Sequence, residues 1–276
     1  KKMKNILKIT FLFVILVFTA GHCIAQTDVI LAVDKSGTMQ ENDPGNLRYE
    51  GAKQFLTMLG LYHDNNQAGV VVFGDGAQSV LDFGYISSDK AQKYADLLIN
   101  QDKDDWTELG LGLKKSLDLL KQSNSKNKNI ILLSDGIIEG NPQTRGVNQE
   151  TALQQAADEV WKEIMPELRR QGIRVYSLGL FKDNRGEEAL KRIAVETGGE
   201  YQKINKPEDF SRVYFNMLNK IEPPSREEDF SAGNKDININ PGDRGVIILG
   251  PSDFTIYSKE SNRTIYPDSS LSNNIE

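Results

Sequence analysis

The sequence contains few cysteines and histidines, the residues that form disulfides, bind zinc, and serve as thiol nucleophiles or catalytic bases. Among 276 residues there is one cysteine, Cys23, and there are two histidines, His22 and His63. These numbers exclude a scaffold held by disulfides and a zinc site built from cysteines. With so few histidines, a catalytic triad that depends on histidine is also disfavoured. The folded protein must therefore be held together by its core.

Basic residues are also in deficit. The chain has 33 Lys and Arg against 39 Asp and Glu, which gives a formal net charge of −6. Nucleic-acid binding depends on a basic face that neutralises phosphates. We therefore expect no nucleic-acid partner.

The first 25 residues differ in composition from the rest. Four lysines precede the apolar run ITFLFVILVFTA, small residues follow it, and there is no acidic residue in this segment. This is the layout of a secretory signal, and the run is shorter than a comfortable membrane span. We predict a signal peptide over 1–25 with cleavage after Ala25, which would change the net charge from −6 to −10. An uncleaved N-terminal anchor is the alternative. The predicted location is secreted, periplasmic or at the cell surface, with membrane contact only through this segment or a missing C-terminal region.

From residue 27 onward, short apolar runs alternate with stretches of helical period. Strands are expected at 29–33, 68–74, 79–86, 129–134, 173–181 and 201–204, and helices at 48–62, 89–101, 107–122, 148–172, 186–199 and 207–222. The second and third strands are separated by a tight turn, which predicts an antiparallel pair, and Pro166 should kink or split the long helix. Strands that alternate with crossover helices indicate an α/β fold with an open, mostly parallel, doubly wound sheet over 27–222.

The remaining residues have a different pattern. Residues 223–236 are rich in Pro, Glu and Ser without a regular period, which predicts a linker. Short apolar runs between turn signals predict strands over 237–276. This β-rich segment is small for an independent domain, and we expect it to be part of a second domain.

Oxygen-bearing side chains follow two of the predicted strands. Asp34, Ser36 and Thr38 come after the first, Asp135 comes after NIILLS, and Thr107 stands at the expected N-cap of a helix. In an extended loop residues i, i+2 and i+4 point the same way, so the first three side chains can converge. Ligands of open α/β sheets bind at the carboxyl ends of strands, where strand order reverses. Carboxylates and hydroxyls suit Mg²⁺, with Mn²⁺ or Ca²⁺ as alternatives.

The candidate residues and their neighbours also have interpretations that involve no metal. A polar turn after a strand is a common use of Asp, Ser and Thr. The acidic residues within 102–105 lack the spacing of a calcium loop, so we expect a solvated loop there. Glu139 is expected to face solvent, and Trp106 is as compatible with packing as with contacting a partner.

Several segments together resemble a known family. DKSGTM…DPGNLRYEGAKQFL, DWTELGLGLKKSLDLL, NIILLSDG, GIRVYSLGLF and IAVETGGEYQKI resemble, in this order, segments of von Willebrand factor type A domains. The resemblance covers residues 27–222. It implies a Rossmann-like fold and a metal-ion-dependent adhesion site made of Asp34, Ser36, Thr38, Thr107 and Asp135. The family usually has Ser where this chain has Thr38, which keeps the hydroxyl. The residue before Asp135 is often Thr in relatives and is Ser134 here, a difference that we expect to be unimportant.

The resemblance implies recognition without turnover. A divalent cation at this site would bind an Asp or Glu carboxylate of a protein partner, in an exported adhesion module. One alternative is a magnesium-dependent phosphotransferase or hydrolase of similar topology. Such an enzyme typically needs a second acid at position 36, where this chain has Ser36. Another alternative is a scaffold of the same family in envelope protein assembly.

Overall fold

The computed structural model describes residues 13–19, 26–62, 65–87, 90–91, 104–181, 185–206, 209–223, 226–230, 243–249, 256–258 and 263–265. The chain divides into two compact units. One is Ile24–Glu222, and the other combines Lys1–Cys23 with Pro223–Glu276. Each unit is described by itself.

The unit Ile24–Glu222 alternates strands and helices as the sequence predicts. Its described strands are β2 (Thr27–Asp34), β3 (Gln67–Phe73), β4 (Ala77–Tyr85), β5 (Asn127–Ser134), β6 (Arg174–Gly179) and β7 (Tyr201–Lys203). Its described helices are α1 (Gly37–Asn42), α2 (Leu47–Tyr62), α4 (Leu109–Leu120), α5 (Pro142–Arg145), α6 (Gln149–Asp158), η1 (Glu159–Ile164), α7 (Met165–Arg170), α8 (Glu187–Glu196) and α9 (Phe210–Ile221). The predicted helix at 89–101 lies almost entirely outside the described residues. The short helices α1 and α5 were not predicted from the sequence.

Six strands form one sheet in the order β4-β3-β2-β5-β6-β7. All neighbouring pairs are parallel except β3 and β4, which pair antiparallel as predicted. From β2 the chain moves outward through β3 to β4 and then returns to place β5 on the other side of β2. Strand order therefore reverses between β2 and β5, which makes their carboxyl ends the expected ligand-binding edge. The predicted α/β class and mostly parallel sheet are confirmed.

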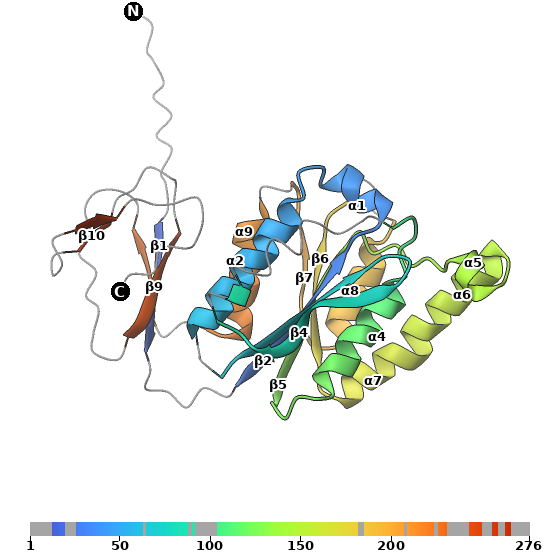
Figure 1. The fold of residues 1–276 in the computed structure, drawn as a ribbon, viewed down its shortest axis with the longest axis horizontal. Helices are drawn as coiled ribbons and strands as arrows, with labels where there is room; N and C mark the ends of the chain where they lie inside the picture. Colours follow the sequence, from blue (N-terminus) through green and yellow to red (C-terminus); the bar gives the residue numbers. More distant parts are fainter. Residues whose placement is uncertain are drawn as a thin grey trace, which may run out of the picture. The chain divides into compact units, whose positions relative to one another are not determined.

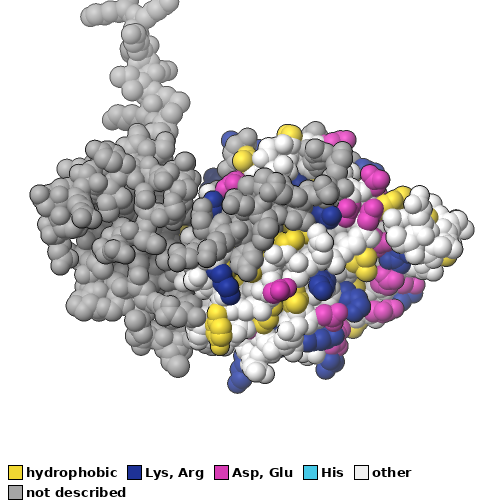
Figure 2. Space-filling view, in the orientation of Figure 1, with side chains coloured by type: hydrophobic (Ala, Val, Ile, Leu, Met, Phe, Trp, Pro, Cys, Tyr) yellow, Lys and Arg dark blue, Asp and Glu magenta, His cyan; other side chains and the backbone are white. Residues whose placement is uncertain are grey.

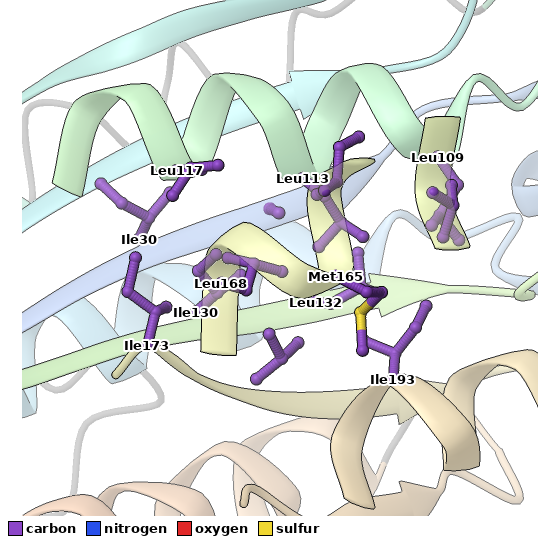
Figure 3. Close-up of a cluster of buried hydrophobic side chains, with 14 of the residues drawn as sticks. Ile30, Leu109, Leu113, Leu117, Ile130, Leu132, Met165, Leu168, Ile173 and Ile193 are labelled. Atoms are coloured by element: carbon purple, nitrogen blue, oxygen red, sulfur yellow. The ribbon is translucent and has the colours of Figure 1, made fainter. Parts of the chain in front are cut away.

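Helices cover both faces of this sheet (Figure 1). Alternate strand residues point to opposite faces, and one set packs against α4, η1, α7 and α8. Figure 3 shows this cluster, in which Ile30 and Ile130 from the sheet meet Leu113 and Leu117 from α4. On the other helical layer α2 packs against α9, with the rings of Phe55 and Tyr214 5.9 Å apart. Burial on both faces explains why β2 is apolar from Val29 to Val33 without alternation.

The close fit of α4 against the sheet leads to a prediction about stability. A Cβ atom added at Gly112 would lie 2.5 Å from Cδ1 of the fully buried Phe73 ring. Gly112→Ala should therefore lower the free energy of unfolding by about 1–3 kcal/mol. The gain in helix propensity, about 1 kcal/mol, opposes this loss only in part. Chemical denaturation measures the change.

Gly110 on the same helix provides the matched control. Its added Cβ would come no nearer than 3.3 Å, to the side chain of Val160. A side-chain methyl can shift, so Gly110→Ala should be neutral or stabilising. Equal stabilities of the two variants would contradict the tight packing of Gly112 on Phe73.

The long predicted helix is interrupted near Pro166, as expected. The helical run from α6 to α7 contains a π-helical segment, η1, directly before α7, in which Pro166 occupies the first turn. Proline has no N–H to donate, so a regular α-helical ladder cannot continue through it. Trp161 lies on η1, where it is half-buried against the core, and the Arg192 guanidinium stacks 4.1 Å from its ring centre.

The other unit contains a three-stranded sheet in the order β8-β1-β9. Its strands are β1 (Phe13–Thr19), β8 (Arg226–Phe230) and β9 (Asp243–Leu249), and β1 is antiparallel to both neighbours. A separate hairpin joins β10 (Ile256–Ser258) and β11 (Arg263–Ile265). β8 falls inside the predicted linker, where the polar sequence REEDF gave no strand signal. β1 falls inside the predicted signal peptide, whose apolar, β-branched composition also suits a strand. Cleavage after Ala25 remains a prediction, and it would remove β1.

Within the described residues, no helix has both the length and the apolar character needed to cross a membrane. On the face drawn in Figure 2, basic and acidic side chains of the described surface are interspersed.

Candidate metal centre

Two aspartates lie at adjacent strand ends, on the edge where strand order reverses. Asp34 is the last residue of β2, and Asp135 directly follows Ser134, the last residue of β5. β2 and β5 are parallel neighbours, so these ends meet at one edge of the sheet. Asp34 is fully buried and Asp135 is 2% exposed. The carboxyl edge of the sheet thus carries two buried carboxylates.

The Asp34 carboxylate is held by two hydrogen bonds. The backbone N–H of Ser36 donates to Oδ1 over 2.8 Å, and the hydroxyl of Ser134 donates to Oδ2 over 2.7 Å. Ser134 also accepts a bond of 3.0 Å from the N–H of Gly136. Ser134 thus takes part in the site through its hydroxyl, which agrees with the expectation that Ser in place of Thr makes little difference here. Its hydroxyl joins the two aspartate loops, a role that threonine at this position could also fill.

The two carboxylates affect each other's charge. Burial and, to a smaller extent, the nearby charge of Asp135 together raise the pKa of Asp34 from 3.8 to about 7, against the lowering effect of the hydrogen bonds. Both effects disfavour the ionised form of Asp34. A divalent cation beside the pair would offset both.

Ser36 and Thr38 come together in a different way from the predicted extended loop. Ser36 is the N-cap residue of α1, and Thr38 lies in the first turn of that helix. Their hydroxyl oxygens are 3.1 Å apart. Ser36 is 1% exposed whereas Thr38 is exposed, so this pair spans from the buried aspartates toward the surface. The predicted convergence of the two hydroxyls occurs, but a helical turn produces it.

Thr107 is connected to the loop after Asp135 by Glu139. The N–H of Thr107 donates to Glu139 Oε2 over 3.1 Å, and the N–H of Glu139 donates to the carbonyl of Thr107 over 3.1 Å. Glu139 is half-buried, and burial, opposed by the bond from Thr107, raises the pKa of its carboxyl group with a further contribution from the charge of Asp135. The expectation that Glu139 faces solvent is therefore wrong, because Glu139 fixes the backbone of a candidate ligand. The helix after Thr107 has Glu108 as its N-cap, one residue later than predicted.

The acidic segment before Thr107 is part of the same edge. Asp104 forms an ion pair of 2.9 Å with Lys35 and accepts a 2.9 Å bond from the N–H of Asp75. Asp75 in turn accepts a 2.8 Å bond from the N–H of Trp106. The prediction of a solvated loop holds for the exposed Asp105 but is wrong for Asp104, which ties the β2 end to the β3–β4 turn. Residues 101–103 lie outside the described part of the chain.

The donor set fits a hard divalent cation. It offers two buried carboxylates, Asp34 and Asp135, with hydroxyls from Ser36, Thr38 and Thr107, and oxygen donors suit Mg²⁺, Mn²⁺ or Ca²⁺. In the part of the chain that the structure describes, no group of three or more His, Cys, Asp or Glu side chains is arranged to hold a metal. Any metal site here must therefore rely on hydroxyls and water as well as on the two aspartates.

Two comparisons of the sequence with known proteins found similar chains. The family model of the von Willebrand factor type A domain matches residues 29–138. An uncharacterized protein of Borreliella burgdorferi is 25% identical over 242 residues, which make up 78% of this chain and 64% of that relative. The chain thus spans somewhat less than two thirds of the length of this relative.

Similar solved structures include several bacterial surface proteins. The PilB minor pilin from Streptococcus sanguinis superposes with a TM-score of 0.54 at 16% identity, over 73% of this chain and 63% of the pilin. A pilus adhesin from Lactobacillus rhamnosus GG superposes with a TM-score of 0.54 at 19% identity, over 80% of this chain and 33% of the adhesin. The von Willebrand factor domain of a type V pili tip protein from Porphyromonas gingivalis superposes with a TM-score of 0.53 at 13% identity, over 72% of this chain and 96% of that domain. At these identities the likeness concerns the fold.

Proposed function

Because the unit Ile24–Glu222 has the fold of a von Willebrand factor type A domain, we propose that this chain is a cation-dependent binding module without enzymatic turnover. In this proposal Asp34, Ser36, Thr38, Thr107 and Asp135 hold a magnesium ion, or manganese or calcium in its place. An Asp or Glu side chain of a protein partner completes the coordination of the ion. The similarity to pilins and a pilus adhesin, together with the predicted signal peptide, supports a location outside the cytoplasm.

One observation carries the proposal. Two carboxylates are buried at the sheet edge where strand order reverses, and their proximity helps to raise the pKa of Asp34 to about 7. Protein interiors rarely hold two like charges together without a functional reason. A bound cation supplies the missing positive charge.

The mixture of ligands then explains why an acidic partner is expected. Ser36, Thr38 and Thr107 offer neutral hydroxyls, so the five proposed ligands together carry only two negative charges. An exchangeable position on the ion suits a further carboxylate, because hard cations prefer charged oxygen donors. The exposed Thr38 marks the side from which a partner can approach.

The phosphotransferase alternative receives no support from position 36. An acid would be needed there, whereas the Ser36 side chain lies 3.1 Å from the hydroxyl of Thr38 and its N–H orients Asp34. These contacts suit a ligand-holding role. The observations contain nothing that favours a scaffold in envelope assembly over a module that binds its partner through the cation.

Removal of one hydroxyl tests the proposed ligand set. Thr107→Val has nearly the same shape and keeps the backbone bonds to Glu139, so it removes only the hydroxyl oxygen. We expect its magnesium affinity, measured by isothermal titration calorimetry, to fall by at least about tenfold. The stability in EDTA should change by less than about 1 kcal/mol.

Thr57→Val is the control for loss of a hydroxyl. Thr57 lies on α2, and its hydroxyl donates to the carbonyl of Lys53 rather than to the site. Its magnesium affinity should equal that of the wild type. If magnesium does not bind the wild type, or binds Thr107→Val equally well, the metal proposal is wrong.

The expected partner chemistry has its own test. Immobilised poly-L-glutamate should retain the wild-type chain in magnesium and release it in EDTA, and poly-L-glutamine should retain it in neither. Repulsion between an acidic polymer and this acidic chain works against binding without the ion. Two results would contradict the claim that the partner offers a carboxylate, while leaving the metal site in place. One is equal retention on poly-L-glutamate in EDTA and in magnesium. The other is no retention in magnesium although calorimetry shows that the ion binds.

A further inference from the structure

A buried charge network begins next to Thr107. Glu108 directly follows this candidate ligand and is 2% exposed. Its carboxylate receives two bonds from Arg145, at 2.6 Å from Nη2 to Oε2 and 3.0 Å from Nε to Oε1. It also accepts a 2.7 Å bond from the N–H of Asn141. Glu108 is therefore fixed by the segment that follows the Asp135 loop.

The guanidinium of Arg145 is held on its other side by α6 and η1. Nη1 and Nη2 of Arg145 contact the two carboxylate oxygens of Glu159 at 2.8 and 2.9 Å. Arg145 ends the single-turn helix α5, which Asn141 caps at its start by accepting from two backbone N–H groups. One side chain thus connects the start of α4 to the junction of α6 and η1.

The network has few ways to relax. A buried carboxylate is stable only when it is paired, and the two carboxylates raise the pKa of Arg145, which remains charged at every ordinary pH. Without Arg145, Glu108 would keep the bond from Asn141 but lose its counter-charge. We expect residues 107–108 then to move toward solvent, away from the loop that carries Asp135 and Glu139, although the N–H of Glu108 also donates to the carbonyl of Gly74 over 2.9 Å.

We propose that Arg145 is a positioning residue of the metal centre, which acts through Glu108 to hold Thr107 beside the Asp135 loop. This inference rests on the proposed function, and it extends the site to a residue outside the ligand set. The alternative is that Arg145 only secures α5 against the domain. The two differ in one respect: a residue that only secures α5 affects stability but not the affinity for the ion.

The test uses the full chain and magnesium alone. Arg145→Met keeps the length of the side chain without its charge and should weaken magnesium binding by about 10–100-fold. Arg145→Lys should lose less, because lysine keeps the charge but cannot form the paired bonds. Arg170→Met is the control, since Arg170 forms the same kind of paired bonds with a carboxylate, that of Glu167 on its own helix α7. Its magnesium affinity should not change.

A double-mutant cycle tests the route through Glu108. In a Glu108→Gln background no buried charge remains to be compensated, so Arg145→Met should have a much smaller effect on magnesium affinity. If Arg145→Met alone does not fold, Arg145→Lys, which keeps the charge, takes its place in both backgrounds. Lower stability of Arg145→Met with unchanged magnesium affinity would overturn the inference and leave the proposed function standing. No magnesium binding by the wild type would overturn both.

Discussion

Without a divalent cation, the Asp34→Asn variant should unfold at a higher temperature than the wild type, and in millimolar magnesium this order should reverse. Asn has the shape of Asp but no charge, so it removes the repulsion from Asp135 and the cost of burying an ion. Its amide can still accept from the N–H of Ser36 and can donate to the hydroxyl of Ser134, which bond Asp34 in the wild type. The variant loses a charged ligand, so the stabilisation by magnesium should disappear.

The pH dependence follows from the raised pKa of Asp34. Its pKa in the folded protein is about 7, against an ordinary value of 3.8. Between these values the folded state binds more protons than the unfolded state, so this group makes the metal-free protein less stable as pH rises through that window. Asn does not titrate. The advantage of Asp34→Asn in EDTA should therefore be small near pH 4 and reach its maximum above about pH 7.

Thermal melts at several pH values measure both effects. We expect the variant to gain about 3–6 °C in EDTA at about pH 8. In magnesium at 100 times its dissociation constant, only the wild type should gain about 2.7 kcal/mol of stability. Asp28→Asn provides a control, because Asp28 is an equally buried aspartate at the opposite end of β2. If Asp34→Asn is destabilising in EDTA at every pH, the aspartate pair is a structural element and is not a site that needs a cation.

The architecture could be predicted because its signals are local. The continuous apolar run of β2 and the spaced leucines of α4 each record how an element packs, and the order of elements implies the sheet. The position of Asp34 and Asp135 at one edge follows from that order, since β2 and β5 flank the reversal. Local patterns failed for α1, which has only six residues and begins at a glycine.

The support around the candidate ligands could not be predicted in this way. Glu139 and Thr107 are separated by 32 positions, and Glu108 and Arg145 by 37, so these contacts depend on how two loops approach each other. Sequence alone does not show whether a glutamate after a strand faces solvent or a backbone N–H. The apolar run at β1 had a different difficulty, because a secretory signal and a buried strand share its composition.

The second large effect is expected at Gly186, where α8 meets the metal centre. A Cβ atom built at Gly186 would lie 2.1 Å from the carbonyl oxygen of Asp135 and 2.3 Å from the carbonyl carbon of Gly136. Gly136 has φ +77°, and a Cβ there would lie 2.4 Å from the carbonyl oxygen of Gly186. The two backbones are thus in direct contact, and neither side can be relieved by turning a side chain. Leu190 and Ile193 hold α8 in the core, so the Asp135 loop is the part that must move.

Gly186→Ala should therefore weaken magnesium binding by at least about tenfold. It should also lower the free energy of unfolding by at least about 3 kcal/mol, since overpacking against backbone exceeds the usual cost in a side-chain core. Calorimetry with magnesium and denaturation in EDTA measure the two effects separately. Gly84→Ala is the control, because a Cβ at Gly84 meets nothing within 4 Å, and both quantities should stay near the wild-type values. A destabilised Gly186→Ala that binds magnesium as tightly as the wild type would show that the contact with α8 stabilises the fold without setting the position of Asp135.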